Sequence, residues 1–150
     1  MCGIIGIFQK NSENLTRQGI DLLKDRGRDG SGITIEEEYT LGHTLHSVVN
    51  EVKQPIKNKF VANCEIYNWK ELEKGKNDAE VLFKLLEKKE IKTVLKKLDG
   101  VYAFAHVKNN KLHLARDILG IKPLWYTEKP FTFASEKKVL KKLGFKNIQE

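Results

Sequence analysis

Short apolar runs and apolar positions at helical spacing alternate along the chain. The runs predict strands, because apolar stretches bounded by turn residues are typical of sheets, and they cover 3–9, 33–37, 39–49, 60–66, 101–107, 112–115, 124–126 and 131–134. Helical spacing predicts helices over 11–25 and 91–98, another that Asn77 or Asp78 could cap, and a last one that ends near Leu143. A short helix and loop is expected over 71–75.

Turn residues between these elements indicate how the strands pair. Residues 108–111, Lys-Asn-Asn-Lys, predict a hairpin turn, and Gln54-Pro55 marks another turn. Ser12 and Ser135 stand where a serine caps a helix. Because neighbouring strands are joined by short turns, we expect antiparallel sheets and the α+β fold class, not a doubly wound parallel sheet.

Composition narrows the class of protein. The 150 residues, 40% hydrophobic and 31% charged, suit a single globular domain. With no apolar run of about 20 residues and no signal-peptide pattern, we expect no membrane contact and a cytoplasmic location. The net charge of +7 comes from lysines spread along the chain, which favours a solvated surface over a nucleic-acid partner. Two cysteines and four histidines lack zinc spacing, so neither metal nor cofactor is predicted.

The first three residues, Met1-Cys2-Gly3, could carry chemistry. Removal of Met1 would give Cys2 a free α-amino group, and such an amine can act as the general base for its own side-chain nucleophile. The apolar run that follows would hold this terminus in a buried strand. This stretch alone is compatible with an inert thiol and with a catalytic one.

Three glycines and two arginines fall within residues 26–32. Such a segment is either a plain turn between helix and strand or a loop that lines a site. In the second case, the guanidiniums of Arg26 and Arg28 are available for an anionic group.

Nine motifs occur in a fixed order through nearly the whole chain. Together they resemble the glutaminase domain of class II glutamine amidotransferases, especially that of the asparagine synthetases. These glutaminase domains are N-terminal-nucleophile hydrolases. Each motif alone is weak, but nine in order make chance agreement negligible. They are MCGIIGI at 1–7, RGRDGSG at 26–32, LGH at 41–43, QP at 54–55, NCEIYN at 63–68, NDAEVL at 77–82, LDGVYAFA at 98–105, ARDILGIKPL at 115–124 and FASE at 133–136.

The resemblance implies a four-layer αββα sandwich of two antiparallel sheets, with residues 1–150 as one amidotransferase domain that hydrolyses glutamine. Cys2 would attack the side-chain amide, while Asn63 and the backbone N–H of Cys64 would stabilise the oxyanion. Glu65 and Asp78 would bind the α-ammonium of the substrate. Without the resemblance, the simpler roles are a helix cap for Asp78 and a turn residue for Asn63.

Several positions depart from the pattern of the family. Where the family usually has glycine, this chain has Cys64, which keeps the backbone N–H but could narrow the pocket. Where the family usually has an arginine that binds the α-carboxylate, this chain has Leu45. His46 would point to the opposite face of a strand, so the candidate substitutes are Arg26, Arg28, or His46 on a bulged strand. Arg28 itself stands where the family often has proline.

The chain lacks the Ser-Gly-Gly-rich nucleotide loop of the ATP-pyrophosphatase domain that follows in complete asparagine synthetases. We therefore expect an excised domain or a stand-alone glutaminase that takes glutamine and passes ammonia to a synthetase domain or subunit. A homodimer stays open. Two other functions also remain: a regulatory or binding module with weakened turnover, and an amidohydrolase that acts on a different amide.

Overall fold

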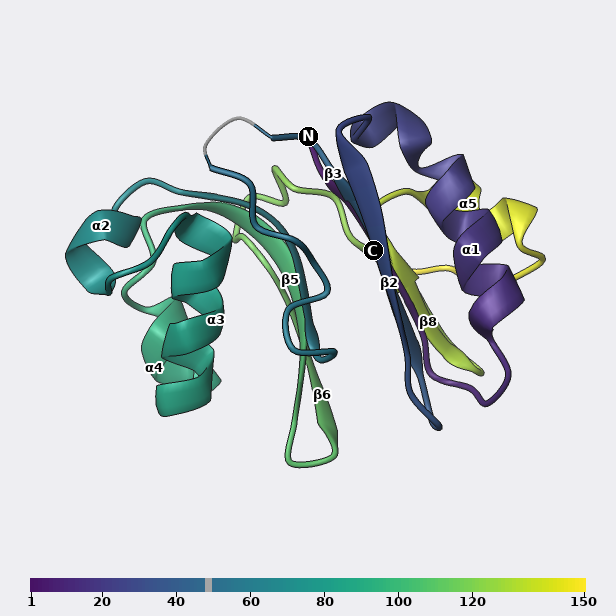
Figure 1. Cartoon of the computed structure of the whole chain (residues 1–150). Coiled ribbons are helices and arrows are strands. Elements are labelled where there is room, and N and C mark those ends of the chain that lie inside the picture. Colours follow the sequence, from purple (N-terminus) through teal and green to yellow (C-terminus); the bar gives the residue numbers. More distant parts are fainter. Residues whose placement is uncertain (48–49) are drawn as a thin grey trace.

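Two antiparallel sheets pack face to face, and helices cover the outer face of each sheet (Figure 1). The computed structural model describes residues 1–47 and 50–150. The strands are β1 (Gly3–Ile7), β2 (Gly30–Ile35), β3 (Thr40–Leu45), β4 (Phe60–Ile66), β5 (Gly100–Lys108), β6 (Lys111–Arg116), β7 (Trp125–Glu128) and β8 (Phe131–Ala134). The helices are α1 (Glu13–Leu22), the 3-10 helix η1 (Lys24–Arg26), α2 (Trp69–Leu72), α3 (Asp78–Lys88), α4 (Ile91–Leu95) and α5 (Lys137–Lys142).

The five-stranded sheet has the order β2-β3-β1-β8-β7. β1 lies in its centre, and all five residues of this strand are buried. Its ladders pair Ile4 with His43 on β3 and Ile5 with Ala134 on β8. The segment that follows Cys2 is therefore held on both sides, so the predicted buried strand is confirmed.

The three-stranded sheet has the order β4-β5-β6, so within residues 1–47 and 50–150 the edge strand β4 pairs with a strand on one side only. β5 and β6 form the predicted hairpin, in which Lys108 pairs with Lys111. Asn109 and Asn110 occupy the turn at φ of 52° and 57°, in the left-handed region that asparagine tolerates better than most residues.

Three apolar clusters separate four layers. Ile5 and Leu140 belong to a cluster between the five-stranded sheet and α1 and α5, and Phe104 and Leu82 belong to one between the three-stranded sheet and α3 and α4. The third cluster fills the space between the sheets, with Phe133 as its largest buried side chain. The predicted α+β class and the αββα sandwich implied by the resemblance are both confirmed (Figure 1).

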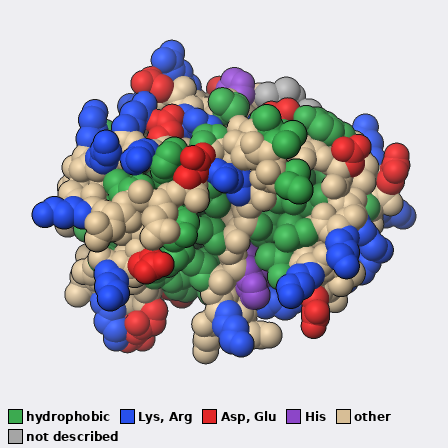
Figure 2. All heavy atoms as spheres, turned by 180° about the vertical axis from the view of Figure 1, so that it is seen from behind, with side chains coloured by type: hydrophobic (Ala, Val, Ile, Leu, Met, Phe, Trp, Pro, Cys, Tyr) green, Lys and Arg blue, Asp and Glu red, His purple; other side chains and the backbone are tan. Residues whose placement is uncertain are grey.

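The surface mixes charge of both signs with apolar residues. Figure 2 shows Lys and Arg side chains dispersed round the visible face and interleaved with Asp and Glu. None of the helices in the described part of the chain combines the length and the apolar character that crossing a membrane requires.

Both predicted serine caps differ from the structure. Ser12 stands at the start of α1, but its hydroxyl donates to the Gln9 carbonyl at 2.8 Å and contacts Thr40 instead of capping the helix. The Ser135 hydroxyl accepts the N–H of Ile4 at 2.9 Å, so it anchors β1 rather than α5. Tertiary partners compete successfully for these short side chains.

Some predicted boundaries also shift. β2 already begins at Gly30, within the segment predicted as a loop, and α2 begins at Trp69 instead of residue 71. The strand predicted over 39–49 ends at Leu45, and residues 48–49 lie outside the described residues. α4 ends at Leu95, three residues before the predicted end.

Candidate active site

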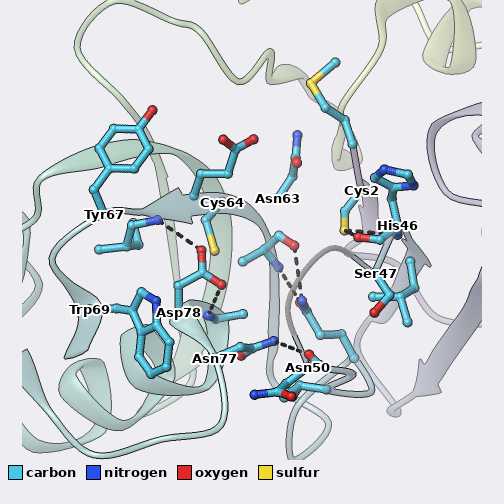
Figure 3. Close-up of a pocket in the computed structure, with 18 residues that line it drawn as sticks. Cys2, His46, Ser47, Asn50, Asn63, Cys64, Tyr67, Trp69, Asn77 and Asp78 are labelled. Atoms are coloured by element: carbon cyan, nitrogen blue, oxygen red, sulfur yellow. Dashed lines mark hydrogen bonds between the residues drawn. The ribbon is translucent and has the colours of Figure 1, made fainter.

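A cavity of about 490 Å³ opens where the start of β1 meets the end of β4, between the two sheets. Cys2, His46 and Ser47 line one side of it, and Asn63, Cys64 and Asp78 line the other (Figure 3). The full lining is Met1, Cys2, Leu45, His46, Ser47, Asn50, Val52, Gln54, Ala62, Asn63, Cys64, Glu65, Ile66, Tyr67, Trp69, Asn77, Asp78 and Ala79. The structure thus brings together six of the eight candidate site residues, all except Arg26 and Arg28.

The Cys2 thiol is held by the backbone of His46. Its Sγ accepts the His46 N–H at 3.4 Å and donates to the His46 carbonyl at 3.7 Å. Burial raises the pKa of the Cys2 thiol, and the N–H of His46 opposes that rise. A nearby base is therefore needed to generate the thiolate at neutral pH.

Arg26 fixes the main chain of Cys2 from outside the cavity. Its Nε donates to the Cys2 carbonyl at 3.0 Å, and its side chain, only 10% exposed, also pairs with Glu136 at 3.2 Å. Arg28 pairs with Asp25 on the surface. Neither guanidinium of the glycine-rich segment lines the cavity. The contact of Arg26 with Glu136, 110 residues away, has no signal in the sequence.

The free edge of β4 presents backbone N–H groups towards the cavity. The Ala62 N–H donates to Gln54 Oε1 at 2.6 Å, and the Ile66 N–H donates to Asp78 Oδ2 at 3.0 Å. Because alternate residues of a strand point their N–H groups to the same edge, the Cys64 N–H points the same way. The described residues offer this middle N–H no hydrogen-bond partner.

The neighbouring side chain supplies a second donor without a partner. Asn63 is 2% exposed, and its Nδ2 makes no hydrogen bond to any described residue. A buried amide normally satisfies its donors, because leaving one unpaired costs about 1–3 kcal/mol. Asn63 Nδ2 and the Cys64 N–H are therefore two unused donors at one site, on the wall opposite Cys2 (Figure 3).

Gln54 holds this edge in place. Besides accepting the Ala62 N–H, its Nε2 donates to the Ala62 carbonyl at 3.3 Å, as a neighbouring strand would. Its own carbonyl lies against Gly32 on β2, where a Cβ would come within 2.0 Å of it. Gln54 therefore links the two sheets directly beside the cavity. Only its place in the Gln-Pro motif marked it in the sequence.

The two predicted ammonium-binding carboxylates have protein partners. Glu65 pairs with Lys122, whose side chain is almost fully buried. Asp78 accepts the N–H of Ile66 through Oδ2 and that of Ala79 through Oδ1, and each carboxylate keeps lone pairs for a ligand. The side chain that caps α3 is Asn77, which accepts the Glu80 N–H at 3.0 Å.

Leu45 and His46 both line the cavity, although a continued strand would place them on opposite faces. The reason is that β3 ends at Leu45, so His46 no longer follows the alternation of the strand. The His46 Nδ1 lies 3.5 Å from a carboxylate oxygen of Asp29.

Cys64 contributes its backbone more readily than its thiol. It lies within β4, so its backbone is extended and does not demand glycine. Burial and the nearby Asp78 hold the pKa of its thiol well above the usual value. The thiol is therefore protonated at neutral pH and is a poor nucleophile.

Comparison with known proteins agrees with this geometry. The family profile described as glutamine amidotransferase domain matches residues 1–149. A Methanocaldococcus jannaschii protein, provisionally named a glutamine-hydrolysing asparagine synthetase, is 35% identical over 182 residues, which cover 93% of this chain and 33% of that protein. Asparagine synthetase B of Escherichia coli is 33% identical over 147 residues, which cover 83% of this chain and 26% of that protein.

The fold has a solved counterpart as well. The glutamine phosphoribosylpyrophosphate amidotransferase of Bacillus subtilis superposes with a TM-score of 0.82 at 22% identity, over 95% of this chain and 44% of that one. The chain spans about a quarter to a third of the two synthetase relatives described above. The match to the family profile is nevertheless nearly complete, and the chain belongs to the glutamine amidotransferase domain family.

Proposed function

We propose that this chain hydrolyses the side-chain amide of glutamine to glutamate and ammonia, with Cys2 as the nucleophile. The observation that carries the proposal is the pair of unused donors, Asn63 Nδ2 and the Cys64 N–H, in the cavity that Cys2 lines. Amide hydrolysis passes through a tetrahedral oxyanion, which needs such preorganised donors. Membership of the amidotransferase family supports the same chemistry.

The nucleophile requires a base because burial raises the pKa of the Cys2 thiol. The half-exposed Met1 is accessible for removal, and its loss converts the amide nitrogen of Cys2 into an α-amine. That amine takes the thiol proton as sulfur attacks the amide carbon. The contact from Arg26 to the Cys2 carbonyl holds the new terminus in position.

The reaction then follows two displacement steps. The tetrahedral intermediate collapses to a thioester, the carbon–nitrogen bond breaks, and the α-amine gives its proton to the leaving ammonia. Water then attacks the thioester, the α-amine accepts a proton from the water, and glutamate and the Cys2 thiol are released. The donors at Asn63 and Cys64 stabilise the oxyanion in both steps.

We further propose that the ammonia serves a synthetase domain or subunit. The relatives described above carry names that join glutamine hydrolysis to asparagine synthesis, and they are three to four times longer than this chain by the shares it covers. Their additional length leaves room for a domain that consumes ammonia. For this chain, asparagine is the proposed product of such a partner.

A single preparation tests the catalytic proposal. Intact mass spectrometry should show a protein lighter by one methionine, and the same sample should convert glutamine into equal amounts of glutamate and ammonia. Cys2→Ala should abolish both products, since it removes the nucleophile. Cys64→Ala is the matched control, because it deletes a thiol from the same cavity but keeps the backbone N–H, and it should stay active.

Two results would contradict the proposal. Turnover that survives Cys2→Ala would exclude Cys2 as the nucleophile. Full activity in protein that retains Met1 would exclude the α-amine of Cys2 as the base.

A further inference from the structure

The charged side chains that line the cavity are all acidic. Glu65 and Asp78 carry the formal charges, and no Lys or Arg within residues 1–47 and 50–150 lines the cavity. The two residues outside these ranges are both valine and carry no charge. Lys122 pairs with Glu65 and offsets one of the negative charges, so the charge of Asp78 remains.

The cations predicted to replace the missing arginine have other partners. Arg26 is bound to the Cys2 carbonyl and to Glu136, and Arg28 to Asp25. The imidazole of His46 already faces the carboxylate of Asp29. Leu45, which stands at the predicted arginine position, presents an apolar side chain to the cavity.

This distribution of charge favours the α-ammonium group of a bound amino acid over its α-carboxylate group. An ammonium group gains from the free lone pairs of Asp78, whereas a carboxylate finds no Lys or Arg side chain among the described lining residues and is repelled by the same residue. The Cys64 thiol responds to the same carboxylate, because burial and then the charge of Asp78 raise its pKa.

We propose that the cavity recognises its substrate through a free ammonium group and a side-chain amide, and that it accepts glutaminyl compounds with a masked α-carboxyl group at least as well as free glutamine. The substrate class therefore includes N-terminal glutaminyl peptides. This inference rests on the proposed function, since the same Cys2 performs the hydrolysis. The side-chain carbon–nitrogen bond breaks, ammonia leaves, water supplies the new carboxylate oxygen, and the masked carboxyl group is unchanged.

The test compares three amides at pH 7, where the α-amines of amino acids and peptides are mostly protonated. They are glutamine, the dipeptide amide Gln-Gly-NH2, which has a free ammonium but no carboxylate, and N-acetylglutamine, which has the reverse. Mass spectrometry of the glutamyl products excludes ammonia that comes from cyclisation. We expect kcat/KM for the dipeptide amide to equal or exceed that for glutamine, and N-acetylglutamine to be at least about tenfold poorer.

The variant Leu45→Arg tests the same inference by adding the cation that the described lining of the cavity lacks. A guanidinium at this position supplies the missing partner of the α-carboxylate, so the ratio of kcat/KM values should shift towards free glutamine by about ten- to a hundredfold. Calorimetric titration of the Cys2→Ala protein with glutamine and with the dipeptide amide measures the same ratio without turnover.

The outcomes separate the two proposals. A preference for free glutamine of tenfold or more in the unmodified protein overturns the inference and leaves the proposed function standing. If no amide is hydrolysed, the proposed function fails and the calorimetric ratio decides the inference. Binding of neither compound overturns it.

Discussion

The two walls of the cavity are built on opposite principles. Cys2 precedes the central strand of a five-stranded sheet, and β3 and β8 bond to that strand on both sides. Asn63 and Cys64 lie on an edge strand whose second side has no partner strand among the described residues. The first wall holds the segment after Cys2 between two paired strands, whereas the second leaves two donors, Asn63 Nδ2 and the Cys64 N–H, without a partner among the described residues. Firm support of the backbone and unpaired donors thus lie on different sheets.

The largest loss of activity should come from a substitution on the wall that β4 forms. Asn63→Ala removes one of the two unused donors, so kcat for glutamine should fall about 10²- to 10³-fold while KM changes little. Steady-state ammonia release measures the change. Cys64→Gly, which keeps its backbone N–H, is the control and should lose much less. Equal kcat values for both variants would show that the side-chain donor of Asn63 does not contribute to catalysis.

The contact between the walls should be sensitive to pH through His43. This histidine is 1% exposed on β3, and burial lowers its pKa to about 4, with the backbone of Ala62 opposing the change. The unfolded chain therefore binds a proton below about pH 6.5 that the folded protein refuses until about pH 4. The free energy of unfolding should fall by about 3 kcal/mol as the pH drops through this window.

Urea denaturation between pH 7.5 and pH 4.5 measures this loss. His43→Gln removes the titrating group, so the difference in slope between the two proteins isolates its contribution from that of the carboxylates. Parallel pH profiles would mean that His43 is not desolvated between the sheets.

A smaller effect should follow loss of the link at Gln54. Gln54→Ala deletes two hydrogen bonds to Ala62, and unfolding should cost about 1–3 kcal/mol less. Because Ala62 adjoins Asn63, kcat should fall together with stability.

Ser135→Ala is the matched control on the wall that carries Cys2. It deletes one hydrogen bond to Ile4, and kcat should stay close to that of the unmodified protein because two ladders still hold β1. Similar losses of kcat in Gln54→Ala and Ser135→Ala would show that the two walls respond alike to the loss of a supporting hydrogen bond.

Sequence reasoning succeeded where local rules decide the structure. Asn109 and Asn110 predict a tight hairpin because asparagine tolerates positive φ, and the apolar run after Cys2 predicts a buried strand. Asn77 caps α3 as one of the two residues named for that role. These outcomes depend on residues a few positions apart.

Sequence reasoning failed where residues far apart in the sequence determine which partner a side chain contacts. Arg26 finds Glu136 across 110 positions, and Lys122 finds Glu65 across 57. The hydrophobic periodicity of the sequence does not indicate either pairing. The sequence therefore suggested that the guanidinium of Arg26 was available for a ligand, whereas in the structure it pairs with Glu136. The position of His46 depended on a strand end that the apolar pattern placed four residues too late.

The occupied edge of β4 has a consequence for the molecule in crowded solution. An exposed strand edge is a template on which another chain can add a strand, and such addition leads to aggregation. Here the Phe60 N–H bonds to Ile56, and Gln54 and Asp78 occupy the N–H groups on either side of Cys64. An incoming strand would have to displace all three partners. The edge therefore leaves only the Cys64 N–H among these groups without a partner in the described part of the chain, while it resists pairing with another protein.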